Sequence, residues 1–227
     1  MNKKVWIIFY VSVLIADLIA VYIGNEMLRY ITKPSLMLLL IVLFISQTRN
    51  VSSSLKKWII LALAFSWVGD VSLMFDDVDE IFFITGLIAF LWAHIWYIVF
   101  LQSVTKIEKI GSKALLVAPG LLWLSILMDI LNPSSLGILR WPVNIYGVVI
   151  ITMFTGALHM GFVNKKWFGL LIILGALSFV VSDSLLALNR FHQPFEYASI
   201  AIMTTYGIAQ LLIILGAVRY ITSTSKQ

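Results

Sequence analysis

The chain has 227 residues, of which 61% are hydrophobic and 12% are charged, and its mean hydropathy is +0.99. Soluble domains carry about 25% charged residues, so this composition excludes an ordinary soluble domain and indicates an integral membrane protein. The formal net charge of +5 comes mainly from basic residues between apolar runs, where they orient the chain and give no reason to expect a nucleic-acid partner. The absence of cysteine excludes disulfides and cysteine metal sites, and the three histidines lack metal-ligand spacing.

The apolar runs predict an all-α polytopic membrane protein with a single integral membrane domain over residues 1–227. This length accommodates about eight helices of ~20 residues and leaves no room for a separate soluble domain. The first run follows Lys3 and Lys4 without a small-residue cleavage site, so we expect a membrane span rather than a signal peptide. Nothing in the sequence indicates an obligate protein partner. The eight predicted spans cover residues 5–23, 34–47, 57–75, 81–102, 113–131, 142–163, 167–188 and 195–218.

The basic residues are distributed unevenly between the two sides of such a bundle. If all eight runs cross the membrane, 12 of the 16 lysines and arginines lie on the side of the N-terminus and 4 on the other. Basic residues concentrate on the cytoplasmic side, so both termini are expected in the cytoplasm; in a bacterium the membrane would be the plasma membrane. The twelve are Lys3, Lys4, Arg49, Lys56, Lys57, Lys106, Lys109, Lys113, Lys165, Lys166, Arg219 and Lys226, and the four are Arg29, Lys33, Arg140 and Arg190.

Two aspartates lie inside apolar runs: Asp70 in LALAFSWVGDVSLMF and Asp183 in LGALSFVVSDSLLAL. An ionised carboxylate in hydrocarbon costs at least ~2.5 kcal/mol, so both are expected in a polar interior site. Each lies about six residues, or ~9 Å, below the outer end of its predicted span. Asp17 falls at the same level and Asp129 lies nearer the outer surface, which suggests a chamber that opens outward. For Asp17 and Asp129 the alternative of a helix-end residue that reaches water stays open.

The predicted span at residues 34–47, which directly follows Lys33, is too short to cross the hydrocarbon core of a membrane. Residues 34–47 number 14, or ~21 Å of helix against a hydrocarbon core of ~30 Å. If residues 27–32 supply outer turns and Pro34 kinks the helix, Lys33 reaches the carboxylate level as a counter-ion. In the alternative, Lys33 lies at the headgroup boundary and Pro34 occupies the first helical turn.

Further polar side chains share helix faces within the spans. His94 and Tyr97 are three residues apart and Tyr206 and Gln210 are four apart, so each pair lies on one face. A lone intramembrane histidine or tyrosine is more often an interhelical hydrogen-bond partner than a catalytic group. The candidates for binding a substrate around the two aspartates are Lys33, His94, Tyr97, Tyr146, Asn189, Arg190, Tyr206 and Gln210.

Five strings along the chain resemble one family of polytopic membrane proteins, the lysoplasmalogenases, also called YhhN-like. They are KPSLMLLL at 33–40, GDVSLM at 69–74, GLIAFLWAHIWY at 86–97, SDSLLALNRF at 182–191 and YGIAQ at 206–210. The resemblance implies hydrolysis of the vinyl ether bond of lysoplasmalogens, which releases a fatty aldehyde and glycerophosphoethanolamine or glycerophosphocholine. It also implies a lysophospholipid substrate taken from the bilayer, no metal or organic cofactor, and catalysis by intramembrane aspartates that match Asp70 and Asp183.

The implied reaction needs an acid and a base, and two carboxyl groups can supply both. Protonation of the β-carbon of a vinyl ether gives an oxocarbenium ion, which water traps as a hemiacetal before it collapses to aldehyde and alcohol. One carboxyl group is expected to stay protonated beside an ionised partner that stabilises the cation and activates water. Which of Asp70 and Asp183 has which role stays open. The phosphate is expected near the outer boundary, where Lys33, Arg140 or Arg190 could meet it.

Two other functional classes fit parts of this pattern. Intramembrane carboxylates with a histidine also form proton relays, which favours a proton- or ion-coupled transporter as the alternative. A relay needs polar groups on both sides of the midplane, whereas the acids here cluster in one half. A scaffold whose aspartates only bind neighbouring helices is the third interpretation.

The charge asymmetry predicts the topology. Reporter fusions after Lys56 and Lys109 are expected to read cytoplasmic, and a fusion at Asp77 is expected to read external, because positive loops stay on the cytoplasmic side. The measurement is the activity of a compartment-specific reporter at each position. An external signal at Lys109 contradicts this topology.

Overall fold

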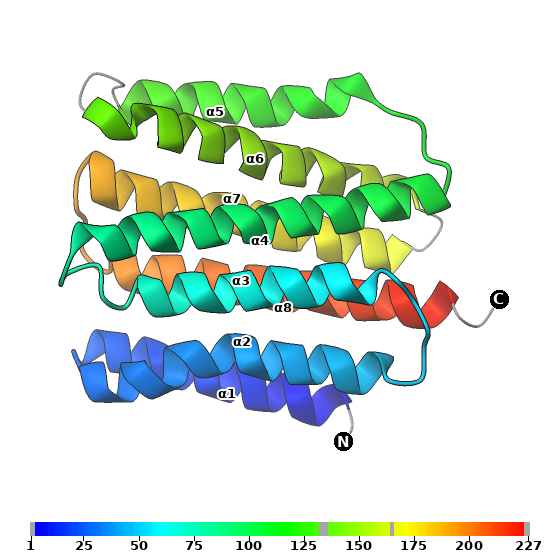
Figure 1. Ribbon diagram of the computed structural model, residues 1–227, viewed down its shortest axis with the longest axis horizontal. Helices are drawn as coiled ribbons and strands as arrows, with labels where there is room; N and C mark the ends of the chain where they lie inside the picture. Colours follow the sequence, from blue (N-terminus) through cyan, green and yellow to red (C-terminus); the bar gives the residue numbers. More distant parts are fainter. Residues whose placement is uncertain (1–2, 132–135, 164–165, 225–227) are drawn as a thin grey trace. The chain divides into compact units, whose positions relative to one another are not determined.

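The computed structural model describes residues 3–131, 136–163 and 166–224 (Figure 1). Within those ranges the chain is built of helices and contains no strand, which confirms the all-α prediction. Lys165 and Lys226, which entered the charge count, lie outside the described residues. The α-helices are α1 (Lys3–Tyr22), α2 (Glu26–Thr48), α3 (Lys56–Ser72), α4 (Glu80–Ile107), α5 (Ala118–Leu131), α6 (Arg140–His159), α7 (Lys166–Phe191) and α8 (Ala198–Thr224). Short 3-10 helices are η1 (Ala114–Val117), η2 (Gly137–Leu139) and η3 (Met160–Phe162).

Seven helical segments of the described chain are long and apolar enough to cross a membrane. The predicted span 57–75 corresponds to α3, which has 17 residues, a rise of ~25 Å against a core of ~30 Å. Backbone hydrogen bonds from Met74 to Val71 and from Phe75 to Ser72 continue the chain through a further turn. The eight-span count, and the cytoplasmic placement of both termini that depends on it, stay predictions.

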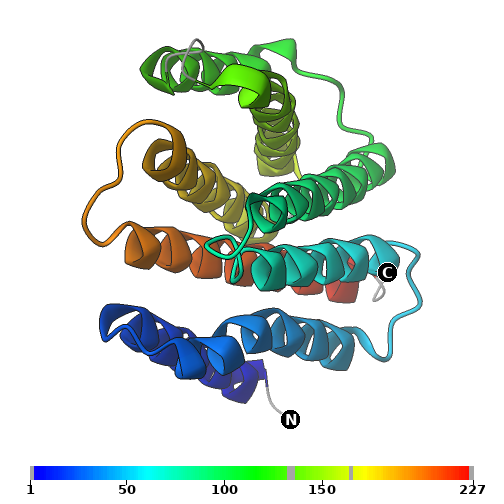
Figure 2. The same ribbon diagram turned by 60° about the vertical axis from the view of Figure 1, so that its left-hand side comes forward.

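The chain packs as two compact units. Unit 1 comprises residues 1–100 and 214–227, and unit 2 comprises residues 101–213, so the boundaries fall inside α4 and α8. In unit 1, α1 packs against α2 and α2 against α3. In unit 2, α5 packs against α6 and α6 against α7 (Figure 2). The expectation of a single membrane domain stays a prediction.

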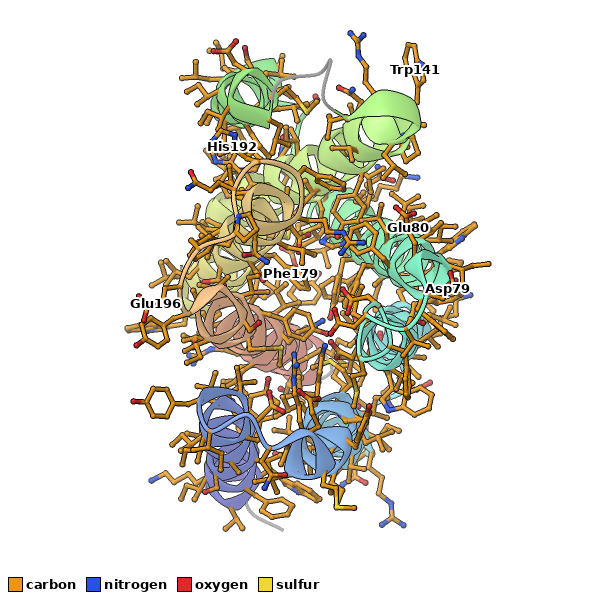
Figure 3. All side chains as sticks on the ribbon, turned by 90° about the vertical axis from the view of Figure 1, so that its left-hand side faces the viewer. Asp79, Glu80, Trp141, Phe179, His192 and Glu196 are labelled. Atoms are coloured by element: carbon orange, nitrogen blue, oxygen red, sulfur yellow. The ribbon has the colours of Figure 1, made fainter. Side chains whose placement is uncertain are left out.

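Local sequence explains where the helices of unit 1 begin. Gly24 has φ +68°, a left-handed conformation that glycine adopts without strain, and it turns the chain from α1 into α2. Asn25 then caps α2, because its side-chain oxygen accepts a hydrogen bond from the backbone N–H of Leu28 at 3.0 Å. Before α4, the carboxylate of Asp79 accepts the backbone N–H of Ile81 at 2.8 Å in the same way. Figure 3 shows Asp79 in this turn.

The second helix resolves the two alternatives for Lys33. α2 begins at Glu26, eight residues before the predicted span, and continues through Pro34 to Thr48. Pro34 lacks the N–H group that would bond the carbonyl of Tyr30, so the helix tolerates it at the loss of one hydrogen bond. Lys33 therefore lies in the helix interior and is 4% exposed, as the counter-ion alternative requires.

Close helix contacts rest on aromatic and small residues. In unit 1, the rings of Trp58 and Trp96 stack with centroids 5.3 Å apart, and Trp96 contacts Trp92 one turn away, which joins α3 to α4. In unit 2, Gly175 of α7 faces α8: a Cβ built there would lie 3.0 Å from the carbonyl oxygen of Ala209. Small residues at such crossings let helix backbones approach, which is the main source of helix association in lipid.

The first residues of α1 and the last turns of α8 lie close together in unit 1. Lys3, at the start of α1, and Arg219, near the end of α8, interact electrostatically. The start of α1 and the end of α8 are drawn on one side of Figure 1.

The close contact between α7 and α8 predicts that a methyl group added at Gly175 lowers the stability of the protein. Gly175→Ala is expected to destabilise the protein by roughly 1–3 kcal/mol, the usual cost of overpacking. The reason is that the new Cβ meets backbone atoms of Ala209 and Ile213 at 3.0 Å, and backbone cannot yield as a side chain does. The matched control is Gly111→Ala, because a Cβ there has no atom within 4 Å. The measurement is the thermal unfolding midpoint in detergent; equal midpoints for the two variants contradict the close approach.

Candidate active site

Asp70 is held near the end of α3, where it is 2% exposed. Two groups from other helices of unit 1 interact with it electrostatically: the ammonium group of Lys33 on α2 and the phenol of Tyr10 on α1. The sequence predicts the burial of Asp70, and it gives Lys33 as the counter-ion in one of two alternatives. A cation and a hydroxyl group beside a buried carboxylate offset the loss of its hydration.

Lys33 connects two carboxylates. Its ammonium group interacts electrostatically with Asp70 and with Asp17, and also with Asp76 in the turn that follows α3. Arg29, one helical turn before Lys33, adds a second cation to the same region. The extended α2 thus brings two positive charges to the level at which the sequence analysis expects the carboxylates.

Asp17 belongs to this cluster and does not reach water at a helix end. It is 0% exposed, and its Oδ1 accepts a hydrogen bond from the Thr32 hydroxyl at 2.7 Å. The charges of Arg29 and Lys33 both act on its carboxylate. Asp17 is expected from the sequence at the level of Asp70, but it is not among the candidate site residues.

Two tyrosines complete the polar cluster of unit 1, and a buried histidine lies on the same helix as one of them. Tyr10 is 0% exposed and interacts with Asp70, Asp17 and the phenol of Tyr97, which is itself buried. Tyr10 was missed, although it lies seven residues before Asp17 and therefore on the same face of α1. His94 is buried, and its Nδ1 lies 2.7 Å from the carbonyl oxygen of Phe90, the geometry of a bond within α4.

Asp183 forms the corresponding group of unit 2. Tyr146 on α6 donates its hydroxyl to Oδ2 of Asp183 on α7, with an O···O distance of 2.7 Å. Both residues are half-buried. A short bond from a hydroxyl to a carboxylate is among the stronger hydrogen bonds in proteins, so Tyr146 fixes the orientation of this carboxyl group. The sequence predicts both residues but not their contact.

Tyr206 and Gln210 lie together on α8, as their spacing predicts. Gln210 is 0% exposed and its Nε2 donates to the Tyr206 hydroxyl at 3.3 Å. The Tyr206 ring meets Phe179 of α7 edge-on, with centroids 5.6 Å apart. Phe179 is one helical turn before Asp183 and is labelled in Figure 3. This pair therefore lies against the helix that carries Asp183.

The predicted residues Asn189 and Arg190 lie at the end of α7. The side-chain oxygen of Asn189 accepts the backbone N–H of Phe195 at 3.3 Å, so it orders the connection to α8. Arg190 is exposed. His192 and Glu196 belong to the same connection (Figure 3). A substrate-binding role for Asn189 and Arg190 stays a prediction.

The two carboxyl groups have different surroundings. Asp70 in unit 1 lies with a lysine, two tyrosines and a second aspartate, whereas Asp183 in unit 2 accepts a tyrosine hydroxyl. The expectation that both aspartates lie in a polar interior chamber that opens outward stays a prediction. Over the described ranges, no three His, Asp or Glu side chains are grouped to hold a metal ion.

The chain is similar to proteins named lysoplasmalogenase. It is 35% identical to lysoplasmalogenase TMEM86B of Homo sapiens over 158 residues, which is 70% of this chain and 62% of that protein. It is 32% identical to lysoplasmalogenase TMEM86A of Homo sapiens over 163 residues, and 31% identical to TMEM86A of Bos taurus over 166; each match covers 70% of this chain and 65% of the relative. The chain thus spans a little under two thirds of the length of these relatives.

No solved structure matches the chain. Residues 28–217 match the YhhN family. This range includes α2 without its first two residues, all of α3 to α7, and most of α8. It contains Lys33, Asp70 and Asp183 but not Asp17 or Tyr10. Because the match covers most of its length, the chain belongs to the YhhN family.

Proposed function

We propose that the protein is a membrane hydrolase that cleaves the vinyl ether bond of lysoplasmalogens. The observation that carries the proposal is the buried group of Asp70, Lys33 and Tyr10, in which Lys33 and Tyr10 both interact with Asp70 inside an apolar helix bundle. The relatives are named lysoplasmalogenases, which favours hydrolysis over ion-coupled transport. Intramembrane ionisable residues are functional sites by default, because their burial is otherwise costly.

The proposed chemistry uses Asp70 and Asp183 as an acid and base pair. One carboxylic acid transfers its proton to the β-carbon of the vinyl ether, and the carboxylate it leaves faces the oxocarbenium ion. The other carboxylate takes a proton from water as the water oxygen bonds to the cationic carbon. The hemiacetal then collapses: its hydroxyl proton is lost, the glycerol oxygen is protonated as it leaves, and a fatty aldehyde and a glycerophospho-alcohol are released. Such general acid–base steps contribute typically 10²–10⁴-fold each.

The remaining predicted residues are proposed to bind and orient the lipid. Lys33 and Arg190 carry the positive charge that a phosphate requires, because charge-assisted bonds to phosphate are strong. The other side chains supply hydrogen-bonding groups beside the two carboxyl groups. They are His94, Tyr97, Tyr146, Asn189, Tyr206 and Gln210.

We also propose that α3 completes eight spans, with both termini in the cytoplasm. The proximity of Lys3 and Arg219 supports an even number, because a chain whose ends lie on one side of the membrane crosses it an even number of times. The turn after α3 lengthens that segment beyond Ser72. The charge asymmetry favours the same orientation.

Replacement of either aspartate by asparagine tests the chemistry. Asp70→Asn and Asp183→Asn keep the shape of the side chain but cannot transfer a proton, so each is expected to lower aldehyde release at least ~100-fold. If the two groups act as a unit, the double variant is expected to be hardly worse than either single one. The measurement is aldehyde release from lysoplasmalogen by purified variants at matched protein levels.

The matched control is Asp129→Asn, since Asp129 is exposed near the end of α5. It is expected to retain full turnover. Turnover within about tenfold of wild type in Asp70→Asn or Asp183→Asn removes that residue from the chemistry, because a positioned acid or base contributes more than this.

Loss of the Tyr146 hydroxyl is expected to lower turnover less than replacement of either aspartate does. Tyr146→Phe removes the 2.7 Å hydrogen bond to Asp183 and keeps the ring, so turnover is expected to fall about tenfold or more. Tyr22→Phe is the control, because Tyr22 is 69% exposed at the end of α1. The readout is kcat with KM measured separately, since an orienting bond affects kcat more than lipid affinity. Wild-type kcat in Tyr146→Phe shows that the hydroxyl does not orient the carboxyl group.

A further inference from the structure

Two buried polar atoms on neighbouring helices of unit 1 have no hydrogen-bond partner among the described residues. They are Oδ2 of Asp17 on α1 and Nε of Arg29 on α2. Asp17 is 0% exposed, and Thr32 occupies only its other oxygen, Oδ1. Of the buried side-chain atoms without a hydrogen bond in the described residues, these two belong to charged side chains that interact with each other. Buried polar atoms are almost always hydrogen-bonded, so this pair is a candidate site for a bound group.

The two atoms have opposite hydrogen-bonding character. The Asp17 oxygen accepts a hydrogen bond and the Arg29 N–H group donates one. The side chains interact electrostatically, but no hydrogen bond joins them. One group can satisfy both atoms only if it donates and accepts at the same time.

A hydroxyl group meets this requirement, and the other polar parts of a phospholipid do not. An ammonium head group only donates, so it would leave the Arg29 N–H unpaired and be repelled by Arg29 and Lys33. A phosphate only accepts and would be repelled by the Asp17 carboxylate. An ester oxygen also only accepts, so it would leave the carboxylate without a donor.

Asp17 and Asp70 share two neighbours, which places this hydroxyl site beside the proposed chemistry. Lys33 interacts with both carboxylates, and Tyr10 also interacts with both. In a lysoplasmalogen the free hydroxyl is on the glycerol carbon next to the one that carries the vinyl ether oxygen. A lipid whose vinyl ether is at Asp70 would therefore bring its free hydroxyl close to the same cluster.

We propose that Asp17 and Arg29 bind the free glycerol hydroxyl of the lysolipid and so select it over lipids acylated at that position. This inference rests on the proposed function and adds the residues that determine specificity. Asp17 precedes the residues 28–217 that match the family, so the match does not assign this role. Acylation removes the proposed donor for Oδ2 of Asp17 and leaves that buried oxygen without a hydrogen bond. Sites built to bind a hydroxyl reject analogues that lack it by as much as ~10⁴-fold.

The test compares two non-hydrolysable lipids that differ by one hydroxyl group. Both are 1-alkyl ethers with the same phosphocholine head group, one with a free 2-hydroxyl and one with hydrogen at that carbon. Wild-type protein in detergent is expected to bind the 2-hydroxy lipid at least about tenfold more tightly by calorimetric titration, as loss of a hydrogen bond to a charged group implies. The same two structures as vinyl ethers, assayed for aldehyde release, test the proposed function separately.

Asp17→Asn is expected to reduce the tenfold preference to less than about threefold. Thr32 would donate to the amide oxygen, and the amide NH₂ group, a donor, would then replace the acceptor Oδ2. Arg29→Met removes the N–H donor and keeps the aliphatic stem, with the same expected direction. The controls Asp129→Asn and Arg49→Met change exposed residues and are expected to keep the wild-type preference.

The possible results separate the two proposals. Equal binding of the two lipids by wild-type protein overturns the hydroxyl site, even if one variant fails to fold. Weaker binding of both lipids by Asp17→Asn, with the preference unchanged, also overturns it and indicates a bound water or a packing role instead. A wild-type preference that disappears in Asp17→Asn supports the site, whether or not the vinyl ethers are hydrolysed. Absence of hydrolysis alone contradicts only the proposed function.

Discussion

The burial of carboxylates in an apolar helix bundle is the constraint on which the rest of this structure depends. An aspartate within hydrocarbon costs at least ~2.5 kcal/mol unless other polar groups surround it. Unit 1 meets this cost with side chains from four helices: Tyr10, Asp17, Lys33, Asp70 and Tyr97. Other features follow from it, above all the extension of α2 through Pro34, which carries Lys33 to the level of the carboxylates.

Unit 2 meets the same constraint with a hydroxyl group. Asp183 accepts the Tyr146 hydroxyl at 2.7 Å, whereas Asp70 of unit 1 interacts with the ammonium group of Lys33. A carboxyl group beside a cation and one beside a hydroxyl group respond differently to gaining or losing a proton. This difference is what an acid and base pair needs, so the two environments suit the proposed hydrolysis better than two equivalent sites would.

The first helix contributes more to this site than the family relationship suggests. The match begins at residue 28, after α1, yet Tyr10 and Asp17 of α1 interact with the cluster that contains Asp70. The unpaired oxygen of Asp17 and the unpaired N–H of Arg29 then give the cluster a binding capacity of its own. In the proposals made above, catalysis and recognition of the free hydroxyl belong to neighbouring carboxylates, Asp70 and Asp17, with separate roles.

The sequence by itself determined the membrane class, the all-α architecture and the burial of Asp70, because hydropathy and helical period are local properties. It left two alternatives for Lys33, since the helix start depends on the Gly24–Asn25 turn and on what Lys33 meets inside the bundle. Only the tertiary structure identified partners: Tyr146 and Asp183 are 37 residues apart, and Asp17 and Thr32 are 15 apart on different helices. Such pairs are set by how helices pack and rotate against one another, which no local pattern encodes.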